Sequence, residues 1–311
     1  MQSVGMKSPS LSVVVPVYGC KDSLIDLVSR IVGVASGLTN ALEVVLVDDY
    51  SLDGGWTVIK NICEKYSCVR GIRLSRNFGQ HIAIMAGFRA STGKIVVVMD
   101  CDLQDPPELI PVLVQGTERY PVSIGVRHGD HQSLVRRLQS RLFRKVFATS
   151  TGISITRELT SFAALRRTVV DEYIKFSEAD QHFLHVLSWL GFEQWEIPYE
   201  RPQRHSGSSS YTFRSRLRHA LHGLFFETSR VLYVVATIGV AMAAVGFVGV
   251  AYVLWRVIVG QTLLGWPSTI SAVVLFGGAS IAIQSVIGIY VAKNFQQSKG
   301  RPLFVVSEII N

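Results

Sequence analysis

Short apolar runs alternate with amphipathic segments over the first part of the chain. The runs that have the composition of buried strands lie at 11–18, 43–49, 70–75, 95–99 and 122–126. Between the first four runs, apolar residues recur at helical spacing in 22–34, 55–66 and 80–90. Strands that alternate with helices at this spacing predict an α/β fold with a mostly parallel, doubly wound sheet.

The run at 95–99 ends in a group of oxygen-bearing side chains. Asp100, Asp102 and Gln104 follow it directly, and a double proline at 106–107 then prevents the strand from continuing. Ligands of open α/β sheets bind beyond the carboxyl ends of the strands. Two carboxylates and an amide oxygen suit Mg²⁺ or Mn²⁺ better than zinc, and such an ion could hold a diphosphate. The alternative is a capping Asp in a polar turn, because the Asp-x-Asp pattern is short.

A second strand also ends in acids. Asp48 and Asp49 close the run at 43–49, and Ser51 follows them. The carboxyl ends of parallel strands lie at one edge of a sheet, so we expect both acid groups at the same edge. A plain Asx turn would account for the residue types at 48–51 but not for the coincidence of two acid-tipped strands.

The pattern changes after residue 230. From 231 to 292 the only charged residue is Arg256, and the stretches 231–255 and 268–292 each contain 25 uncharged residues. That length is enough to cross a hydrocarbon core of ~30 Å. Lys and Arg precede and follow the pair, which predicts a two-helix transmembrane hairpin with both ends in the cytoplasm. We therefore expect an integral protein of the bacterial inner membrane.

Two basic amphipathic segments, 134–147 and 213–226, carry apolar residues opposite Arg and Lys. Such helices lie at membrane surfaces, and packing against the sheet is the alternative. The second runs straight into the first span, which favours the membrane. The expected organisation is a cytosolic domain over 1–212, a juxtamembrane helix over 213–230, transmembrane helices within 231–292, and a cytosolic C-terminal segment over 293–311. In that last segment, residues 301–306 predict a short strand that returns to the cytosolic domain.

Charge and cysteine content narrow the partners. The span 127–230 has 16 Lys and Arg against 10 Asp and Glu, which beside a membrane favours lipid head groups. The sequence pI of 9.4 also fits nucleic-acid binding, but the chain has no zinc-finger, basic-zipper or RNP pattern, and two spans argue against it.

The four cysteines lack disulfide-framework and zinc-ligand spacing, so we interpret them as reduced thiols. Residues 1–12 lack the apolar core of a signal peptide, which favours a cytoplasmic first domain.

Five features, in this order, carry a family resemblance. They are VVPVY at 14–18, VDDYSLDG at 47–54, RNFG at 76–79, DCDLQDPPE at 100–108, and the paired apolar segments near the C-terminus. The chain resembles the family 2 glycosyltransferases with the GT-A fold, and within them it is similar to the polyprenyl-phosphate glycosyltransferases. The resemblance spans nearly the whole chain. It implies transfer of a sugar from a nucleotide-sugar donor, expected to be UDP-linked, to undecaprenyl or dolichyl phosphate at the cytoplasmic face.

The resemblance also implies roles for individual residues. The donor nucleotide sugar would be bound by Pro16, Tyr18, Asp48, Asp49, Ser51 and Asp100. The set Asp100, Asp102 and Gln104 would hold Mg²⁺ or Mn²⁺. Arg127 and Arg204 match basic positions that approach phosphates, and independently a guanidinium offers planar, bidentate pairing to phosphate oxygens. Ordinary surface arginines are the alternative.

The chain departs from the family pattern at Ser161. Related enzymes carry an Asp in a Gly-Asp-Phe-type segment, where this chain has Thr160, Ser161 and Phe162. Either Glu158 supplies a displaced base, or no base is needed because an acceptor phosphate is already largely ionised at pH 7, or the acceptor or the activity differs. Gln181 is not followed by the Arg-Trp of a Gln-x-x-Arg-Trp motif, which argues against a processive polysaccharide synthase.

Two other functions stay open. A membrane-tethered nucleotide-sugar-binding regulatory protein without turnover is favoured by Ser161 and disfavoured by the intact metal set. A glycosyltransferase with a soluble or protein acceptor would use the hairpin only as an anchor. The sequence leaves open the sugar, the pathway, and whether copies of the chain form a homo-oligomer.

Overall fold

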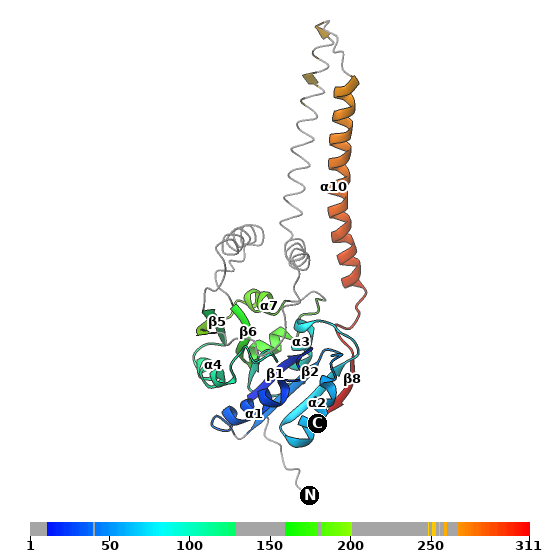
Figure 1. Ribbon diagram of the computed structural model, residues 1–311. Helices are drawn as coiled ribbons and strands as arrows, with labels where there is room; N and C mark the ends of the chain where they lie inside the picture. Colours follow the sequence, from blue (N-terminus) through cyan, green and yellow to red (C-terminus); the bar gives the residue numbers. More distant parts are fainter. Residues whose placement is uncertain are drawn as a thin grey trace. The chain divides into compact units, whose positions relative to one another are not determined.

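A computed structural model of the chain is shown in Figure 1. It describes residues 11–39, 41–128, 159–178, 182–200 and 266–311, and isolated positions between 248 and 259. The chain divides into two compact units, each of which is described by itself. The first comprises residues 1–133, 155–209 and 302–311, and the second comprises residues 134–154 and 210–301.

The first unit is built on an eight-stranded sheet. Its strands are β1 (Leu11–Val17), β2 (Leu42–Asp48), β3 (Val69–Leu74), β4 (Ile95–Val98), β5 (Val122–His128), β6 (Leu159–Arg166), β7 (Gln194–Glu200) and β8 (Val306–Ile310). Their order across the sheet is β7-β5-β6-β4-β1-β2-β3-β8. The group β4-β1-β2-β3 is parallel, as is the pair β5 and β7, whereas β6 and β8 run antiparallel to their neighbours. The predicted α/β class is therefore confirmed, and the sheet is mixed.

Helices cover both faces of the sheet (Figure 1). On one face lie α1 (Leu24–Ala35), α2 (Gly55–Lys65), the 3-10 turn η1 (Pro107–Leu109) and α4 (Ile110–Gly116). On the other lie α3 (Gln80–Ala90), α6 (Arg167–Tyr173) and α7 (Phe183–Leu190). Successive side chains of a strand point to opposite faces, so Val13 and Val15 join the first core cluster and Val14 joins the second. A strand covered on both sides has to be apolar along its whole length, which is the pattern at 11–17.

Helix α3 has the bounds that its periodicity predicts. Its residues 82–88 are all buried, and Phe88 packs against Tyr173 of α6 and Phe183 of α7. At Gly87 an added Cβ would collide with the side chain of Val14 in β1, so glycine lets the helix lie close to the strand. This close packing fixes the first residue of the helix, Gln80, at the carboxyl edge of the sheet.

The last strand differs from its prediction. We expected it at 301–306, but β8 covers Val306–Ile310 and pairs antiparallel with β3. The apolar side chains of Leu303 and Phe304 pack instead against the core cluster that contains α3. An apolar run alone does not show whether its side chains are buried in a strand or against a helix. Side-chain contacts of Glu308 with Trp56 and Lys60 join β8 to helix α2.

In the second unit the structure describes helix α10, Trp266–Ser298, which includes the apolar stretch predicted at 268–292. Among the described residues, no helix combines the length and the apolar character that crossing a membrane requires. The predicted basic helices at 134–147 and 213–226 lie outside the described residues, as does most of the predicted first span at 231–255.

Candidate functional site

The acid-tipped strands meet at one edge of the sheet, as predicted. Strand β1 lies between β4 and β2, and all three are parallel. Their carboxyl ends are therefore side by side, with Val17 paired to Asp48 across β1 and β2. The loops that follow these three strands, together with residues from α3, β5, β6 and β7, form the candidate site.

Asp100 is the centre of this site. Its Oδ1 accepts hydrogen bonds from Nε2 of Gln80 at 2.7 Å and from Oγ of Ser161 at 3.0 Å. Burial, followed by the charges of Asp105 and Asp102, raises the pKa of Asp100 from 3.8 to about 6. The side chain thus lies in a group of acids that holds more negative charge than its surroundings neutralise, which is the condition that a bound cation relieves.

Asp105 links the acid loop to the far strands of the sheet. Its fully buried carboxylate accepts the hydroxyl of Tyr199 at 2.6 Å and the backbone N–H of Asp100 at 3.2 Å. Burial and the Asp105 carboxylate raise the pKa of Tyr199 to about 12, so its hydroxyl stays protonated and donates. The phenol lies on β7, which pairs with β5, the strand that carries Arg127.

Arg127 is the cation of this cluster. Burial acts to lower its pKa, but Tyr199 and the carboxylates of Asp105 and Asp100 outweigh burial and raise it. Its Nε is buried and has no hydrogen-bond partner among the residues that the structure describes. A permanently charged guanidinium with an unused donor beside a group of acids can bind an anionic oxygen.

The side chains at 100–104 fit a hard divalent cation. Asp102 is half-buried, and one of its oxygens accepts the backbone N–H of Gln104 at 3.1 Å. The Oε1 of Gln104 is a buried acceptor for which the described residues provide no hydrogen-bond donor. Within those residues no three His, Cys, Asp or Glu side chains gather as a metal site. The predicted set is of another composition, two carboxylates and an amide oxygen. Mg²⁺ sites in enzymes commonly have this composition, with substrate phosphates and water as the other ligands.

The backbone is strained on two of these loops. In the described part of the chain, the non-glycine residues with positive φ are Tyr50 and Leu103, both at 60°. A left-handed conformation costs such residues roughly 1–2 kcal/mol each. Tyr50 follows the acids of β2 and Leu103 follows Asp102, so both strained positions lie in the candidate site. Strain of this kind is typical of functional loops.

The acids at the end of β2 are engaged with neighbouring backbone. Asp48 is fully buried, accepts the N–H of Ser51 at 3.0 Å and pairs with Arg73 at 3.2 Å. The two oxygens of Asp49 accept the N–H groups of Phe78 and Gly79 at 2.7 and 2.8 Å. Burial raises the pKa of Asp49 even though these hydrogen bonds act to lower it. In this structure Asp49 therefore holds the RNFG segment, and with it the start of α3, at the site.

The other residues predicted to bind the nucleotide also lie at this edge. Pro16 is buried near the end of β1, and the side chain of Tyr18 is 55% exposed just beyond it. Ser51 is buried, and its Oγ lies 3.4 Å from both the N–H of Gly19 and the carbonyl oxygen of Val17. The exposed ring of Tyr18 is thus the part of this group that is open to a ligand, while Pro16 and Ser51 shape the backbone beneath it.

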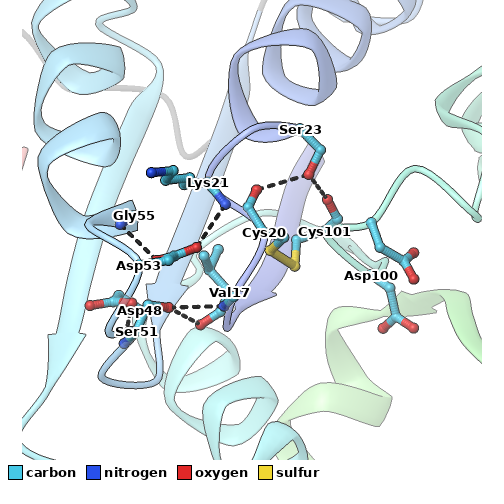
Figure 2. Close-up of a disulfide and its surroundings, with 12 residues drawn as sticks. Val17, Cys20, Lys21, Ser23, Asp48, Ser51, Asp53, Gly55, Asp100 and Cys101 are labelled. Atoms are coloured by element: carbon cyan, nitrogen blue, oxygen red, sulfur yellow. Dashed lines mark hydrogen bonds between the residues drawn. A yellow bond between two sulfur atoms is a disulfide. The ribbon is translucent and has the colours of Figure 1, made fainter. Parts of the chain in front are cut away.

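A disulfide joins two of the loops, which corrects our interpretation of the cysteines as thiols. Cys20, after β1, is bonded to Cys101, between the two acids of the Asp-x-Asp motif (Figure 2). Their separation of 81 residues matches no framework pattern, but β1 and β4 are adjacent parallel strands, and the Cα atoms are 6.3 Å apart. The other two cysteines, Cys63 and Cys68, are free thiols as expected.

The sequence did not predict that Gln80 and Ser161 support Asp100, although it marked Ser161 as a departure from the family pattern, nor that Tyr199 supports Asp105. Gln80 comes from the start of α3, Ser161 from β6 and Tyr199 from β7. Gln80 follows the RNFG segment directly, and that position was the available signal. The strand order that brings Ser161 and Tyr199 to the site carries no local signal in the sequence. The predicted site residues Glu158 and Arg204 lie outside the described residues.

Comparisons with known proteins agree with this geometry. The sequence profile of glycosyl transferase family 2 matches residues 12–174. An uncharacterised glycosyltransferase of Bacillus subtilis, YkcC, is 30% identical over 300 residues, which cover 96% of this chain and 93% of that protein. An undecaprenyl-phosphate 4-deoxy-4-formamido-L-arabinose transferase of Shewanella sediminis is 32% identical over 305 residues, which cover 96% and 92%.

A solved structure shares the fold. The glucosyl-3-phosphoglycerate synthase of Mycobacterium tuberculosis, in complex with Mn²⁺, UDP-glucose and phosphoglyceric acid, matches with a TM-score of 0.52 at 15% identity. The match covers 71% of this chain and 79% of that chain. At this level of identity the likeness shows a common arrangement of sheet and helices, the GT-A-like fold.

Proposed function

The chain belongs to glycosyl transferase family 2 and to its polyprenyl-phosphate glycosyltransferase group, and from this membership we propose that it transfers a sugar from a UDP-linked donor to a polyprenyl phosphate. The observation that carries the proposal is the cluster of Asp100, Asp102, the buried amide oxygen of Gln104 and the guanidinium of Arg127. It combines a site for a cation with a site for an anion. The relatives named as undecaprenyl-phosphate transferases support a lipid acceptor.

The donor half of the site consists of the loops after β1, β2 and β4. Asp100, Asp102 and Gln104 would hold Mg²⁺ or Mn²⁺, and the ion would supply positive charge to offset the charge of the departing nucleoside diphosphate. Tyr18, which is 55% exposed, offers an aromatic face to the base. Asp48 and Asp49 keep the surrounding loops in place through their hydrogen bonds with backbone N–H groups.

The acceptor half is assigned to Arg127. An oxygen of the acceptor phosphate attacks the anomeric carbon of the sugar, the bond from that carbon to the diphosphate breaks, and UDP leaves with the electron pair. A phosphate monoester has a second pKa of about 6, so its attacking oxygen carries no proton that must be removed. The phosphate needs positioning, which Arg127 supplies through charge-assisted hydrogen bonds. Arg204 is the second proposed phosphate ligand. Glu158 would have a role only in the alternative mechanism, in which a displaced base is needed.

This mechanism gives Ser161 a supporting role. The serine stands where relatives are expected to carry an acid, and its hydroxyl donates to Asp100. A hydroxyl in that position stabilises the ionised form of Asp100, the form that binds a cation. The acceptor phosphate does not require a base at this position, so the substitution is compatible with transfer.

We further propose that the chain acts at the cytoplasmic face of a membrane. The uncharged stretches 231–255 and 268–292 and their basic flanks support a membrane hairpin. The acceptor's long hydrocarbon chain also requires the reaction to occur at a membrane. Mg²⁺ or Mn²⁺, the nucleotide sugar and the lipid phosphate are then the ligands of a single site.

A transfer assay tests the proposal. Membranes that contain the full-length protein are incubated with a panel of labelled UDP-sugars, undecaprenyl phosphate and Mn²⁺, and the label in the organic phase is measured. We expect one sugar to be transferred, and we expect the transfer to require the divalent cation. The Asp102→Asn variant keeps the shape of the side chain and removes one charge from the cation site, so it should abolish transfer without unfolding the protein.

The same assay separates the alternatives. A glycosyltransferase with a soluble or protein acceptor would leave the label in the aqueous phase or attached to protein, and not in the organic phase. A nucleotide-sugar-binding protein without turnover, the candidate that the serine at position 161 favours, would bind UDP in calorimetry and transfer nothing. Either result would contradict the lipid-phosphate assignment.

A further inference from the structure

The Cys20–Cys101 disulfide connects the two halves of the donor site. Cys20 lies two residues after Tyr18, on the loop between β1 and α1. Cys101 lies between Asp100 and Asp102, on the loop after β4. Figure 2 shows the two sulfur atoms bridging these loops, with the Asp100 carboxylate on the other side of Cys101. A single covalent bond therefore joins the proposed nucleotide loop to the proposed metal loop.

Hydrogen bonds already tie the β1–α1 loop to the loop after β2. The backbone N–H of Lys21 donates to Asp53 at 3.0 Å, and that of Gly19 approaches Oγ of Ser51 at 3.4 Å. Toward the loop after β4, the Ser23 hydroxyl lies 2.6 Å from the carbonyl oxygen of Cys101 and 2.9 Å from that of Cys20. Beyond the loops, Arg30 of α1 pairs with Glu108 of η1 at 2.7 Å. The disulfide is the covalent link between the nucleotide loop and the metal loop.

Cys20 is the more exposed cysteine of the bonded pair. Cys20 is half-buried, whereas Cys101 is buried with 8% of its surface exposed. A thiolate of a dithiol reductant attacks the Cys20 sulfur, and Cys101 leaves as a thiolate. The second thiol of the reductant then resolves the mixed disulfide. Two electrons and two protons pass to the protein, which gains two thiols, and the reductant becomes a disulfide.

The remaining cysteines do not compete in this exchange. Burial raises the pKa of Cys63 and of Cys68, which keeps both thiols protonated and weakly nucleophilic. Neither is part of the candidate site. Thiol–disulfide exchange with a reductant therefore takes place at the Cys20–Cys101 pair, which spans the donor loops.

We propose that the Cys20–Cys101 disulfide is a redox switch on donor binding: the oxidised pair holds the nucleotide loop and the metal loop together, and its reduction by a cellular dithiol weakens binding of a nucleoside diphosphate with its cation. This inference rests on the proposed function. Binding to loops that are already joined avoids the cost of ordering them. Reduction should therefore raise the Kd for UDP in Mn²⁺ roughly five- to tenfold.

The first experiment counts thiols and follows the loops without any ligand. The full-length protein in detergent is treated with glutathione disulfide or with dithiothreitol, the reagent is removed, the protein is unfolded in denaturant, and its thiols are alkylated and counted by mass spectrometry. We expect the two free cysteines, Cys63 and Cys68, to be labelled after oxidation, and all four after reduction. Hydrogen exchange should increase on reduction in the segments 18–23 and 99–105 and stay unchanged in α2 and β3. Four labelled thiols after oxidation, or unchanged exchange in both segments, would overturn the switch.

The second experiment measures UDP binding in Mn²⁺ by calorimetry for both redox forms. The double variant Cys20→Ser/Cys101→Ser should bind as weakly as the reduced protein and should not respond to reductant. The matched control Cys68→Ser removes a thiol outside the site and should keep the full response. Equal Kd values for the oxidised and reduced protein would contradict the proposal.

The two experiments also separate this inference from the proposed function. If neither form binds UDP, the glycosyltransferase assignment fails, and the switch on donor binding fails with it. Increased hydrogen exchange in the two loops on reduction would then show only that the bond restrains both loops. If UDP binds equally to both forms while exchange changes on reduction, the proposed function stands and only the switch is wrong.

Discussion

Asp100 has a higher free energy in its ionised form than an ordinary carboxylate, because burial and the neighbouring acids Asp105 and Asp102 oppose its charge. Its pKa is raised from 3.8 to about 6, and a shift of this size corresponds to at most about 3 kcal/mol. A carboxyl whose pKa is higher in the folded state stabilises that state at pH values below its unfolded-state pKa, relative to the ionised form. This contribution is lost as the pH rises through the folded-state pKa. At pH 7 without a cation, the ionised Asp100 therefore destabilises the fold relative to a neutral side chain of the same shape.

We predict that Asp100→Asn increases the free energy of unfolding of the metal-free protein at pH 7 by up to about 3 kcal/mol. The measurement is denaturant unfolding in the presence of a chelator. The gain should shrink as the pH falls through about 6 and should vanish below 3.8, where the wild-type side chain is protonated in both states. A variant that is less stable than the wild type at pH 7 would contradict this account of the acid cluster.

Ser161 supports the same carboxylate, and the structure changes what we expect of it. From the sequence, a serine in place of a base should be replaceable at little cost. The hydrogen bond to Asp100 predicts instead that Ser161→Ala weakens Mn²⁺ binding roughly tenfold or more, because a hydrogen bond to a charged group contributes ~1.5–3 kcal/mol. Calorimetry with UDP and Mn²⁺ measures this, and Ser161→Thr, which keeps the hydroxyl, should restore binding.

Two further observations decide whether Ser161 acts on the metal or on the acceptor. The KM for the lipid phosphate should not change in Ser161→Ala once Mn²⁺ is saturating. A raised KM with unaltered Mn²⁺ affinity would place the serine at the acceptor instead.

A separate variant tests for a base. Glu158→Gln should retain transfer, because an ionised acceptor phosphate needs no base. Loss of transfer in this variant with UDP binding intact would identify Glu158 as a displaced base.

At the scale of elements, the packing of α6 gives an independent test of the core. Tyr173 is fully buried between the rings of Phe88 and Phe183, and its hydroxyl has no hydrogen-bond partner in the described part of the structure. We predict that Tyr173→Phe is neutral or raises the free energy of unfolding by about 1 kcal/mol, because the variant no longer buries an unsatisfied hydroxyl. Thermal unfolding and UDP binding are the measurements, and UDP binding should not change. A loss of more than about 1 kcal/mol would show that the hydroxyl has a partner that stabilises it.

The elements that the sequence predicted well are those with a strong local pattern. Strands β1 to β4 and helix α3 follow from apolar runs and helical spacing, and the parallel pairing of β4, β1 and β2 explains why Asp48 and Asp100 meet. Strand β8 was misplaced by several residues because Leu303 and Phe304 are apolar for another reason, packing on the α3 side. Some contacts depend on which strands, far apart in the sequence, lie side by side in the sheet. The contacts of Tyr199 with Asp105 and of Cys20 with Cys101 are of this kind, and they have no local signature in the sequence.

At the scale of the whole molecule, the proposed hairpin determines on which side of the membrane the termini and the loop lie. Lys and Arg flank the pair of apolar stretches, whereas the segment between them has Arg256 alone. We predict that a reporter fused after Asn311 is cytoplasmic and that one inserted near Leu263 is periplasmic. Labelling of single introduced cysteines from outside intact cells provides the measurement. A cysteine near the C-terminus that is labelled, together with one near Leu263 that is not, would exclude the hairpin.

The central claim is that the acceptor is the phosphate of a polyprenol, and one comparison tests it most directly. Purified full-length protein is given a labelled UDP-sugar, Mn²⁺ and either undecaprenyl phosphate or undecaprenol, which have the same hydrocarbon chain and differ only in the phosphate. The account predicts that label passes to undecaprenyl phosphate, that undecaprenol receives none, and that Arg127→Ala lowers the transfer rate by roughly one to two orders of magnitude. Equal labelling of both lipids, or transfer that is unaffected in Arg127→Ala, would contradict it.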